Sequence, residues 1–234
     1  MGNQLDICEI CGADLKYIET ASDYECYFCG EIKKTSIVCS KGHYICDGCH
    51  SKGAIDVIKD FCKKTDLTDP FEIADEIMKH PNFKMYGPEH HILVPVSILT
   101  SLKNLKIKKP DGTYVEYKDI LNAIQRASKV PGGWCGFYGT CGAGIGSGIA
   151  LSIFTGATPA TNKYRTLANK TTSRSLSRIA DNLEHCCKRS VRISIAEAIK
   201  ILNEYFNLGL DYNPRKCDFT DINDKCERVN CPIF

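Results

Sequence analysis

The stretch between residues 8 and 49 constrains this chain more than any other part of its sequence. It carries seven cysteines and one histidine at ligand spacing: Cys8, Cys11, Cys26, Cys29, Cys39, His43, Cys46 and Cys49. A C-x2-C turn places two thiolates on one tetrahedral ion, so eight donors are enough for two zinc ions. The stretch has little apolar content to bury so many thiols without a metal. The sequence therefore predicts a small zinc-binding module.

The spacing leaves open how these donors share their ions. In a zinc ribbon the first two C-x2-C pairs hold one ion together, and the following segment supplies a second site in which His43 ranks ahead of His50. The pairs can instead interleave, as in a cross-brace, so that the first pair shares its ion with Cys39 and His43. Iron is the competing metal, because four thiolates also suit an iron centre.

Three regions differ in their sequence pattern. Residues 1–50 alternate cysteine pairs with strand-like runs, which favours a β-rich module of the zinc-ribbon or treble-clef kind. Residues 51–209 have helical periodicity, and residues 210–234 have none. The strand-like runs are 15–19, 24–27 and 35–39. We expect a mainly α protein: a small β-rich module, an all-helical domain and an irregular tail that contains cysteines.

Helix signals divide the helical region. Pro70 and Pro88 each suit the first turn of a helix, and Ser194 with Glu197 matches a capping box. The expected helices cover 47–64, a segment opening at Pro70, a segment opening at Pro88, 117–128, about 140–154, 161–182 and 194–206.

A glycine-rich segment lies inside the helical region. No charged side chain lies between Lys129 and Lys163, a length that could span a membrane. Eight glycines between residues 132 and 148 dilute its hydrophobicity, which favours a buried helix instead. Each glycine inside a helix costs about 0.5–1 kcal/mol relative to alanine. Either a neighbouring helix packs closely against this face, or a cofactor lies against the backbone near Cys135 and Cys141.

Further cysteines and histidines suggest chemistry in the helical domain. Helix N-termini and adjacent cations favour thiolate over thiol, and a helix N-terminus keeps a histidine neutral. We therefore expect one catalytic dithiol or cluster site, although core or loop positions are the simpler explanation for some of these residues. The candidates are Cys135, Cys141, Cys186 and Cys187, with His90 or His91 close by.

The tail carries three more cysteines, Cys217, Cys226 and Cys231. Few apolar side chains accompany them to offset the entropy of ordering, so we expect them to bind a cofactor, an iron–sulfur cluster. Three thiolates are one short of the usual set. The fourth ligand would be external or one of Cys62, Cys186 and Cys187, and a disordered tail with free thiols is the alternative.

Three motifs carry a family resemblance. They are MKHPNFKMYGPEHHILVPV, VPGGWCGFYGTCGAGIGSGIALSIFTGATP and HCCKR, and the tail adds a C-x4-C-P ending. Together they resemble a domain-of-unknown-function family of anaerobic archaea and bacteria, and the resemblance implies no particular activity. CGFYGTCGAGIG is also loosely similar to redox-associated proteins with a C-GCAxxG-C-C pattern, but its residues are reordered.

Charge and cysteine content narrow the classes of function. A net charge of +2 gives no field for non-specific binding to nucleic acid, and no export signal is present, so we expect a cytoplasmic protein that is not bound to a membrane. Fifteen cysteines suit a reducing, anaerobic cell. The favoured function is an accessory role, with a protein partner, in redox, sulfur-transfer or metallocofactor maturation chemistry. The alternative is a zinc-ribbon module that recognises a protein or nucleic acid without catalysis.

Overall fold

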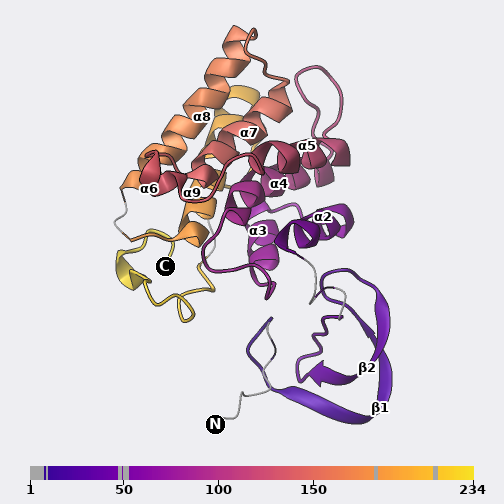
Figure 1. Ribbon diagram of the computed structural model, residues 1–234. Coiled ribbons are helices and arrows are strands. Elements are labelled where there is room, and N and C mark those ends of the chain that lie inside the picture. The colour runs from indigo at the N-terminus through magenta and orange to yellow at the C-terminus, as the bar shows by residue number, and fades with distance from the viewer. Residues whose placement is uncertain (1–7, 9, 47–48, 50–52, 182–183, 213–215) are drawn as a thin grey trace. The chain divides into compact units, whose positions relative to one another are not determined.

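A computed structural model describes residues 8, 10–46, 49, 53–181, 184–212 and 216–234 (Figure 1). About half of the chain is helical, and the described part contains eight α-helices and one small antiparallel sheet, as predicted. In chain order the elements are β1 (Leu15–Glu25), β2 (Ile32–Cys39), α2 (Ala54–Lys64), α3 (Pro70–Met78), α4 (Glu89–Asn104), α5 (Tyr117–Ala127), α6 (Trp134–Phe137), α7 (Gly142–Thr155), α8 (Asn162–Ala180), α9 (Cys187–Phe206) and the 3-10 helix η1 (Arg228–Asn230).

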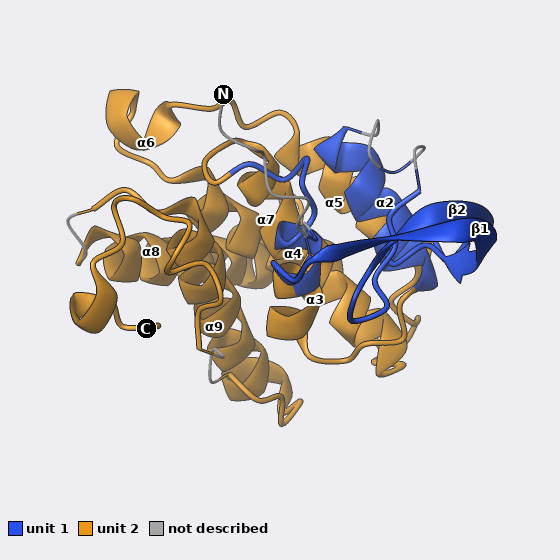
Figure 2. Cartoon of the chain, turned by 90° about the horizontal axis from the view of Figure 1, so that it is seen from below, with its two compact units in different colours: residues 1–64, 76–84 blue, residues 65–75, 85–234 orange. Residues whose placement is uncertain are grey.

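The chain divides into two compact units (Figure 2). Unit 1 comprises residues 1–64 and 76–84, and unit 2 comprises residues 65–75 and 85–234. Helix α3 is therefore shared between the two units. The domain boundaries expected from the sequence, after residues 50 and 209, stay predictions.

Unit 1 is built on the hairpin of β1 and β2. Leu15 pairs with Cys39 at the open end of the hairpin, and Glu25 pairs with Ile32 next to the turn. The register shifts between Tyr17 and Ser22, so the two runs expected as separate strands form one strand with an irregularity. Most of the hairpin is exposed to solvent. Apolar burial alone therefore gives this hairpin little stability.

A few contacts connect residues 76–84, the second segment of unit 1, to the cysteine-rich segment. The Phe28 ring packs against His80 at a centroid distance of 4.1 Å, and the Tyr27 hydroxyl donates a hydrogen bond to Glu76. The Asn82 side chain donates to the Cys49 carbonyl at 3.4 Å. Residues 76–84 thus supply a small packed surface for the loops that carry the cysteines.

Unit 2 is a helical bundle with α4 and α7 in its core. Helix α4 begins directly after Pro88, as predicted, and is buried continuously from His90 to Leu102. Helix α7 lies between α4 and α8 (Figure 1). It matches the expected glycine-rich helix and is also largely buried. No helix in the described ranges combines the length and the apolar character needed to cross a membrane.

The glycines of α7 are explained by close helix packing. A Cβ added at Gly146 would lie 2.7 Å from the His91 carbonyl oxygen of α4, and one added at Gly144 would lie 2.7 Å from the Leu176 side chain of α8. Real Cβ atoms do not approach other atoms so closely. Across the α8 contact, the hydroxyls of Ser147 and Ser175 hydrogen-bond at 2.9 Å. Of the two explanations left open by the sequence, a neighbouring helix therefore accounts for these positions.

The predicted start of the last long helix is wrong. Helix α9 begins at Cys187, with Cys186 as its N-cap, and not at the Ser194/Glu197 capping box. Ser194 is fully buried inside the helix, and Glu197 pairs with Lys200 one turn later. The capping-box pattern is short and recurs by chance, whereas burial of the preceding turns extends the helix toward its N-terminus.

Candidate metal centres

Two turns of identical design present the first cysteine pairs. In each, the glycine after the second cysteine donates its backbone N–H to the carbonyl of the first, Gly12 to Cys8 at 2.7 Å and Gly30 to Cys26 at 2.8 Å. Both glycines have φ of +67°, a conformation that costs glycine little. The C-x2-C-G sequence therefore folds locally into a knuckle that points two sulfurs at one place.

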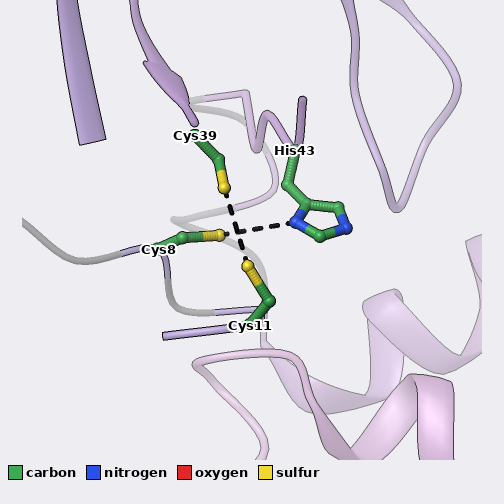
Figure 3. Close-up of side chains that lie close together, drawn as sticks. All are labelled: Cys8, Cys11, Cys39 and His43. Carbon is green, nitrogen blue, oxygen red and sulfur yellow. Dashed lines mark hydrogen bonds between the residues drawn. The ribbon is translucent and has the colours of Figure 1, made fainter. Parts of the chain in front are cut away.

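Two sets of four donors gather in unit 1. The first set is Cys8, Cys11, Cys39 and His43 (Figure 3), and the second is Cys26, Cys29, Cys46 and Cys49. Within each set, all donor atoms lie within 4.8 Å of one another, so each could hold a metal ion. All eight predicted ligands thus fall into two groups of four. His50 lies outside the described residues.

The distances within these sets match a tetrahedral ion. The sulfurs of Cys11 and Cys39 are 3.6 Å apart, and those of Cys29 and Cys46 are 3.7 Å apart. A Zn–S bond of about 2.3 Å gives a tetrahedron with an edge of about 3.8 Å. The Cys8 sulfur and His43 Nδ1, also 3.8 Å apart, complete the first set.

The hairpin explains why the sets interleave. Cys39, at the open end of β2, lies beside the first knuckle, which precedes β1. The second knuckle forms the turn at the other end, and the Tyr27 N–H bonds the Tyr44 carbonyl at 2.8 Å, bringing the last pair to that turn. The two knuckles are therefore kept apart. The structure has the cross-brace pairing and not the ribbon pairing of the first two knuckles.

The electrostatics of both sets favour a cation. In the first, burial raises the pKa of Cys39, but hydrogen bonds from Lys41 N–H and His43 bring it down to about 6. In the second, burial is likewise outweighed by bonds from backbone N–H groups, and the pKa of Cys26 is about 7. Burial raises the pKa of Cys8 to about 11 and, with the neighbouring Cys26, that of Cys49. One thiol in each set ionises readily, and a bound cation would allow its neighbours to follow.

The cysteines of the helical unit are arranged differently. Cys187 is half-buried, and this burial raises its pKa to about 11, with smaller contributions from the charges of Cys141, Cys186 and Cys135. The expected convergence of these cysteines at one site stays a prediction. Burial thus opposes the thiolate form of Cys187, against the effect expected of the adjacent cations. Lys188 itself is buried, and its pKa falls to about 8.

The two predicted histidines face different partners. Nδ1 of His90 lies 3.0 Å from the Gly87 carbonyl, and Nδ1 of His91 lies 3.1 Å from the Val130 carbonyl. The His91 ring packs on Gly142, next to Cys141. Burial lowers the pKa of both histidines, as expected for neutral imidazoles.

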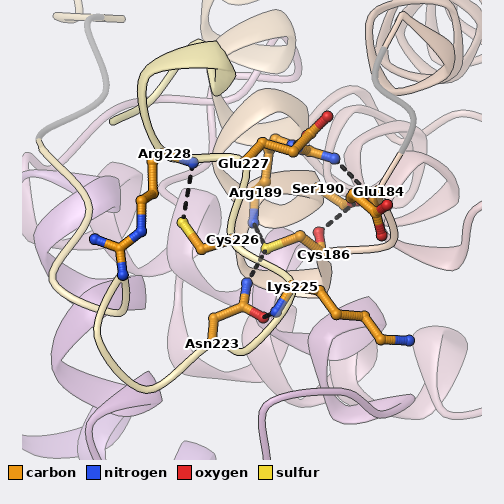
Figure 4. Close-up of polar contacts among 9 residues, drawn as sticks. All are labelled: Glu184, Cys186, Arg189, Ser190, Asn223, Lys225, Cys226, Glu227 and Arg228. Carbon is orange, nitrogen blue, oxygen red and sulfur yellow. Dashed lines mark hydrogen bonds and ion pairs between the residues drawn. The ribbon is translucent and has the colours of Figure 1, made fainter.

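The tail cysteines meet Cys186. Cys186, Cys217, Cys226 and Cys231 line one small cavity in unit 2. Cys186 caps α9, and its sulfur accepts bonds from the Arg189 N–H at 3.4 Å and the Asn223 side chain at 3.7 Å (Figure 4). Cys62 belongs to α2 of unit 1. Asn223 and the buried Arg192 had no signal in the sequence, since only folding brings them to this cavity.

Comparison with known proteins places the helical unit in a family. No curated protein and no solved structure matches the chain. Residues 58–234 match a family described as "Family of unknown function (DUF5714)". The matched region contains every cysteine of the helical unit and tail, whereas the cysteine-rich start lies outside it. The match covers more than half of the chain, which therefore belongs to the DUF5714 family.

Proposed function

We propose that the protein is a zinc-containing accessory protein in redox, sulfur-transfer or metallocofactor maturation chemistry. Two zinc ions occupy the interleaved sites of unit 1 and stabilise its fold. The thiols of unit 2 carry the chemistry. The observation that supports this division best is the contrast between the closed donor sets of unit 1 and the four thiols of unit 2 that line one cavity.

Zinc suits both sets of unit 1. Four cysteines, or three cysteines with one histidine, are its common structural ligand sets, and thiolates disfavour magnesium or calcium. Every coordination position is filled by protein, which leaves none open for a substrate or water. The ions of unit 1 therefore contribute folding free energy and take no part in a reaction.

The thiols of unit 2 have the surroundings of a reactive site. Cys186 accepts a hydrogen bond at the N-terminus of a long helix, and Lys188 and Arg189 follow it closely in the chain. Lys188 is buried and lines the same cavity as Cys186, and its positive charge favours a negatively charged sulfur species there. Such a species could be a thiolate, a persulfide or a thiolate bound to iron.

A protein partner is part of this proposal. Tyr17 and Ile37 face each other across the hairpin and are 62% and 43% exposed. Exposed aromatic and branched side chains on a strand pair favour protein contact over nucleic-acid contact. Nearby Lys33 is paired with Glu31 at 3.2 Å, which weakens the case for a basic nucleic-acid surface.

Anaerobic purification of the full chain tests the proposal. Zinc, iron, acid-labile sulfide and sulfur bound to cysteine would be measured by elemental analysis and mass spectrometry. We expect about two zinc ions per chain. Cys11→Ser should lose the ion of the first set, and Cys135→Ser, an exposed cysteine outside both sets, should keep both ions.

The cysteines of unit 2, called the helical thiols below, test the part of the proposal that assigns them the chemistry. We expect them to carry persulfide after exposure to a polysulfide, which donates sulfane sulfur to a thiolate and leaves a shorter polysulfide. Bound iron is expected after exposure to ferrous iron, and a reversible disulfide after exchange with a small disulfide. If the protein holds zinc and these thiols stay unmodified under every treatment, the accessory role is wrong. The non-catalytic binding module would then be the better description.

A further inference from the structure

We propose that Cys186, Cys217, Cys226 and Cys231 ligate one iron–sulfur cluster, with Cys186 supplying the thiolate that the tail lacks. The inference rests on the proposed thiol chemistry of unit 2 and names its cofactor and ligands. All four cysteines line one cavity, although Cys186 precedes the tail cysteines by a whole helix. Four cysteine thiolates are the usual ligand set of such a cluster.

The tail is fastened to the start of α9 by contacts on both sides of Cys226. Asn223 accepts a hydrogen bond from the Tyr86 hydroxyl at 2.9 Å and donates to the Cys186 sulfur. Glu227, directly after Cys226, forms an ion pair with Arg189 (Figure 4). These contacts bring a segment with little regular structure back to the helix that carries the fourth cysteine.

Backbone N–H groups point at two of these sulfurs. Arg189 N–H donates to Cys186 and Arg228 N–H donates to Cys226, both at 3.4 Å. Hydrogen bonds of this kind stabilise thiolate over thiol, and they are among the features that tune iron–sulfur clusters. Two of the four sulfurs therefore already accept backbone hydrogen bonds in the folded protein.

The walls of the cavity are apolar and positively charged. Phe219 and Ile233 are buried, and the Lys188 ammonium and Arg192 guanidinium lie over the Phe219 ring at 4.9 and 5.3 Å. Arg192 is fixed by Asp75 at 2.5 Å. A cluster held by four thiolates carries negative charge, so buried cations stabilise it, and apolar neighbours keep solvent away.

These four cysteines share a cavity but are not gathered tightly enough for a single ion. Four ligands of one ion would be gathered as tightly as the donors of unit 1, but among the described residues these cysteines form no such set. In a cluster each thiolate binds a different iron, so the sulfurs lie further apart. The cavity is about 20 Å³, and inserting a cluster requires the tail to move outward. The short helix η1 is its only helix in the described residues.

Anaerobic reconstitution of the full zinc-loaded chain with ferrous iron and sulfide tests the ligand set. Iron, acid-labile sulfide, the visible spectrum and electron paramagnetic resonance after reduction would be recorded. We expect about four iron and four sulfide per chain in the unmodified protein. Cys186→Ser and Cys226→Ser should lose most of both. Cys187→Ser is the matched control, because it changes the adjacent residue, which does not line the cavity.

Three results would overturn the assignment. One is equal iron and sulfide in all variants, and another is loss in Cys187→Ser but not in Cys186→Ser. The third is no iron uptake by the unmodified protein while its zinc content and circular dichroism are normal. If persulfide or disulfide still forms on the helical thiols, the proposed function survives that third result and only the cluster assignment fails. Circular dichroism and zinc content of each variant exclude misfolding as the cause of lost iron.

Discussion

At the scale of single residues, His90 and His91 show how burial sets protonation. Burial, with a further contribution from Lys188, holds the pKa of His90 well below its usual value of 6.5. Burial also lowers the pKa of His91, although its bond to the Val130 carbonyl opposes this. Both imidazoles are therefore neutral in the folded protein at neutral pH.

Replacing His90 should make the helical unit less sensitive to acid. The unfolded chain protonates this histidine below a pKa of about 6.5, whereas the folded chain does not, so stability is lost as pH falls from about 7.5 to about 5. For one histidine this loss is at most about 2 kcal/mol. His90→Asn keeps a donor for the Gly87 carbonyl and removes the titration.

Urea unfolding followed by tryptophan fluorescence measures this effect. The chain has one tryptophan, Trp134, which lies in α6 of unit 2, so the signal reports the helical unit. We expect the difference in unfolding free energy between about pH 7.5 and about pH 5 to shrink in His90→Asn. An unchanged difference would show that His90 is not the group that titrates on unfolding.

At the scale of elements, α7 depends on glycine for its place in the bundle. Alanine is usually the better helix residue by about 1 kcal/mol. At Gly146, however, a methyl group would meet the His91 carbonyl at 2.7 Å and Pro95 at 3.0 Å. A backbone oxygen cannot turn aside as a flexible side chain can, so the helices must separate.

Gly146→Ala should therefore destabilise the helical unit by roughly 1–3 kcal/mol, against the intrinsic helix preference. Gly136→Ala is the matched control, because a Cβ there, in α6, would have no atom within 4 Å. Its stability should be unchanged or slightly increased. Urea denaturation measures the free energy of unfolding of both variants. An increase in stability for Gly146→Ala would contradict close packing of α4 on α7.

At the scale of the whole molecule, the two units derive their stability from different sources. The hairpin of unit 1 is mostly exposed, and many of its buried residues are cysteines. Unit 2 buries most of three helices, α4, α7 and α9. Only unit 1 should therefore need metal in order to fold.

Removing zinc with a strong chelator should unfold unit 1 and leave unit 2 folded, so one experiment tests both expectations. We expect residues 8–46 to become sensitive to protease, because too little apolar surface remains to hold the hairpin. The urea concentration at the midpoint of unfolding of unit 2, measured by Trp134 fluorescence, should not change. If unit 1 remains resistant without metal, structural zinc is wrong, and restoring resistance by adding zinc alone is the control.

What the sequence determined by itself is local. The eight ligands of unit 1 follow from the spacing of cysteines and His43, since each knuckle closes within a few residues. The starts of α3 and α4 follow from Pro70 and Pro88, which favour the first helical turn. The absence of charged residues between Lys129 and Lys163 likewise predicts the buried helix α7.

What only the tertiary structure decided is which distant residues meet. The register of the hairpin brings Cys39 to the first knuckle, and the spacing of the cysteines in the sequence does not predict that register. Cys186 and Cys187 are neighbours in the chain, yet only Cys186, the extended N-cap of α9, lines the cavity of the tail cysteines. Such contacts depend on packing across the whole unit, so short sequence patterns could not predict them.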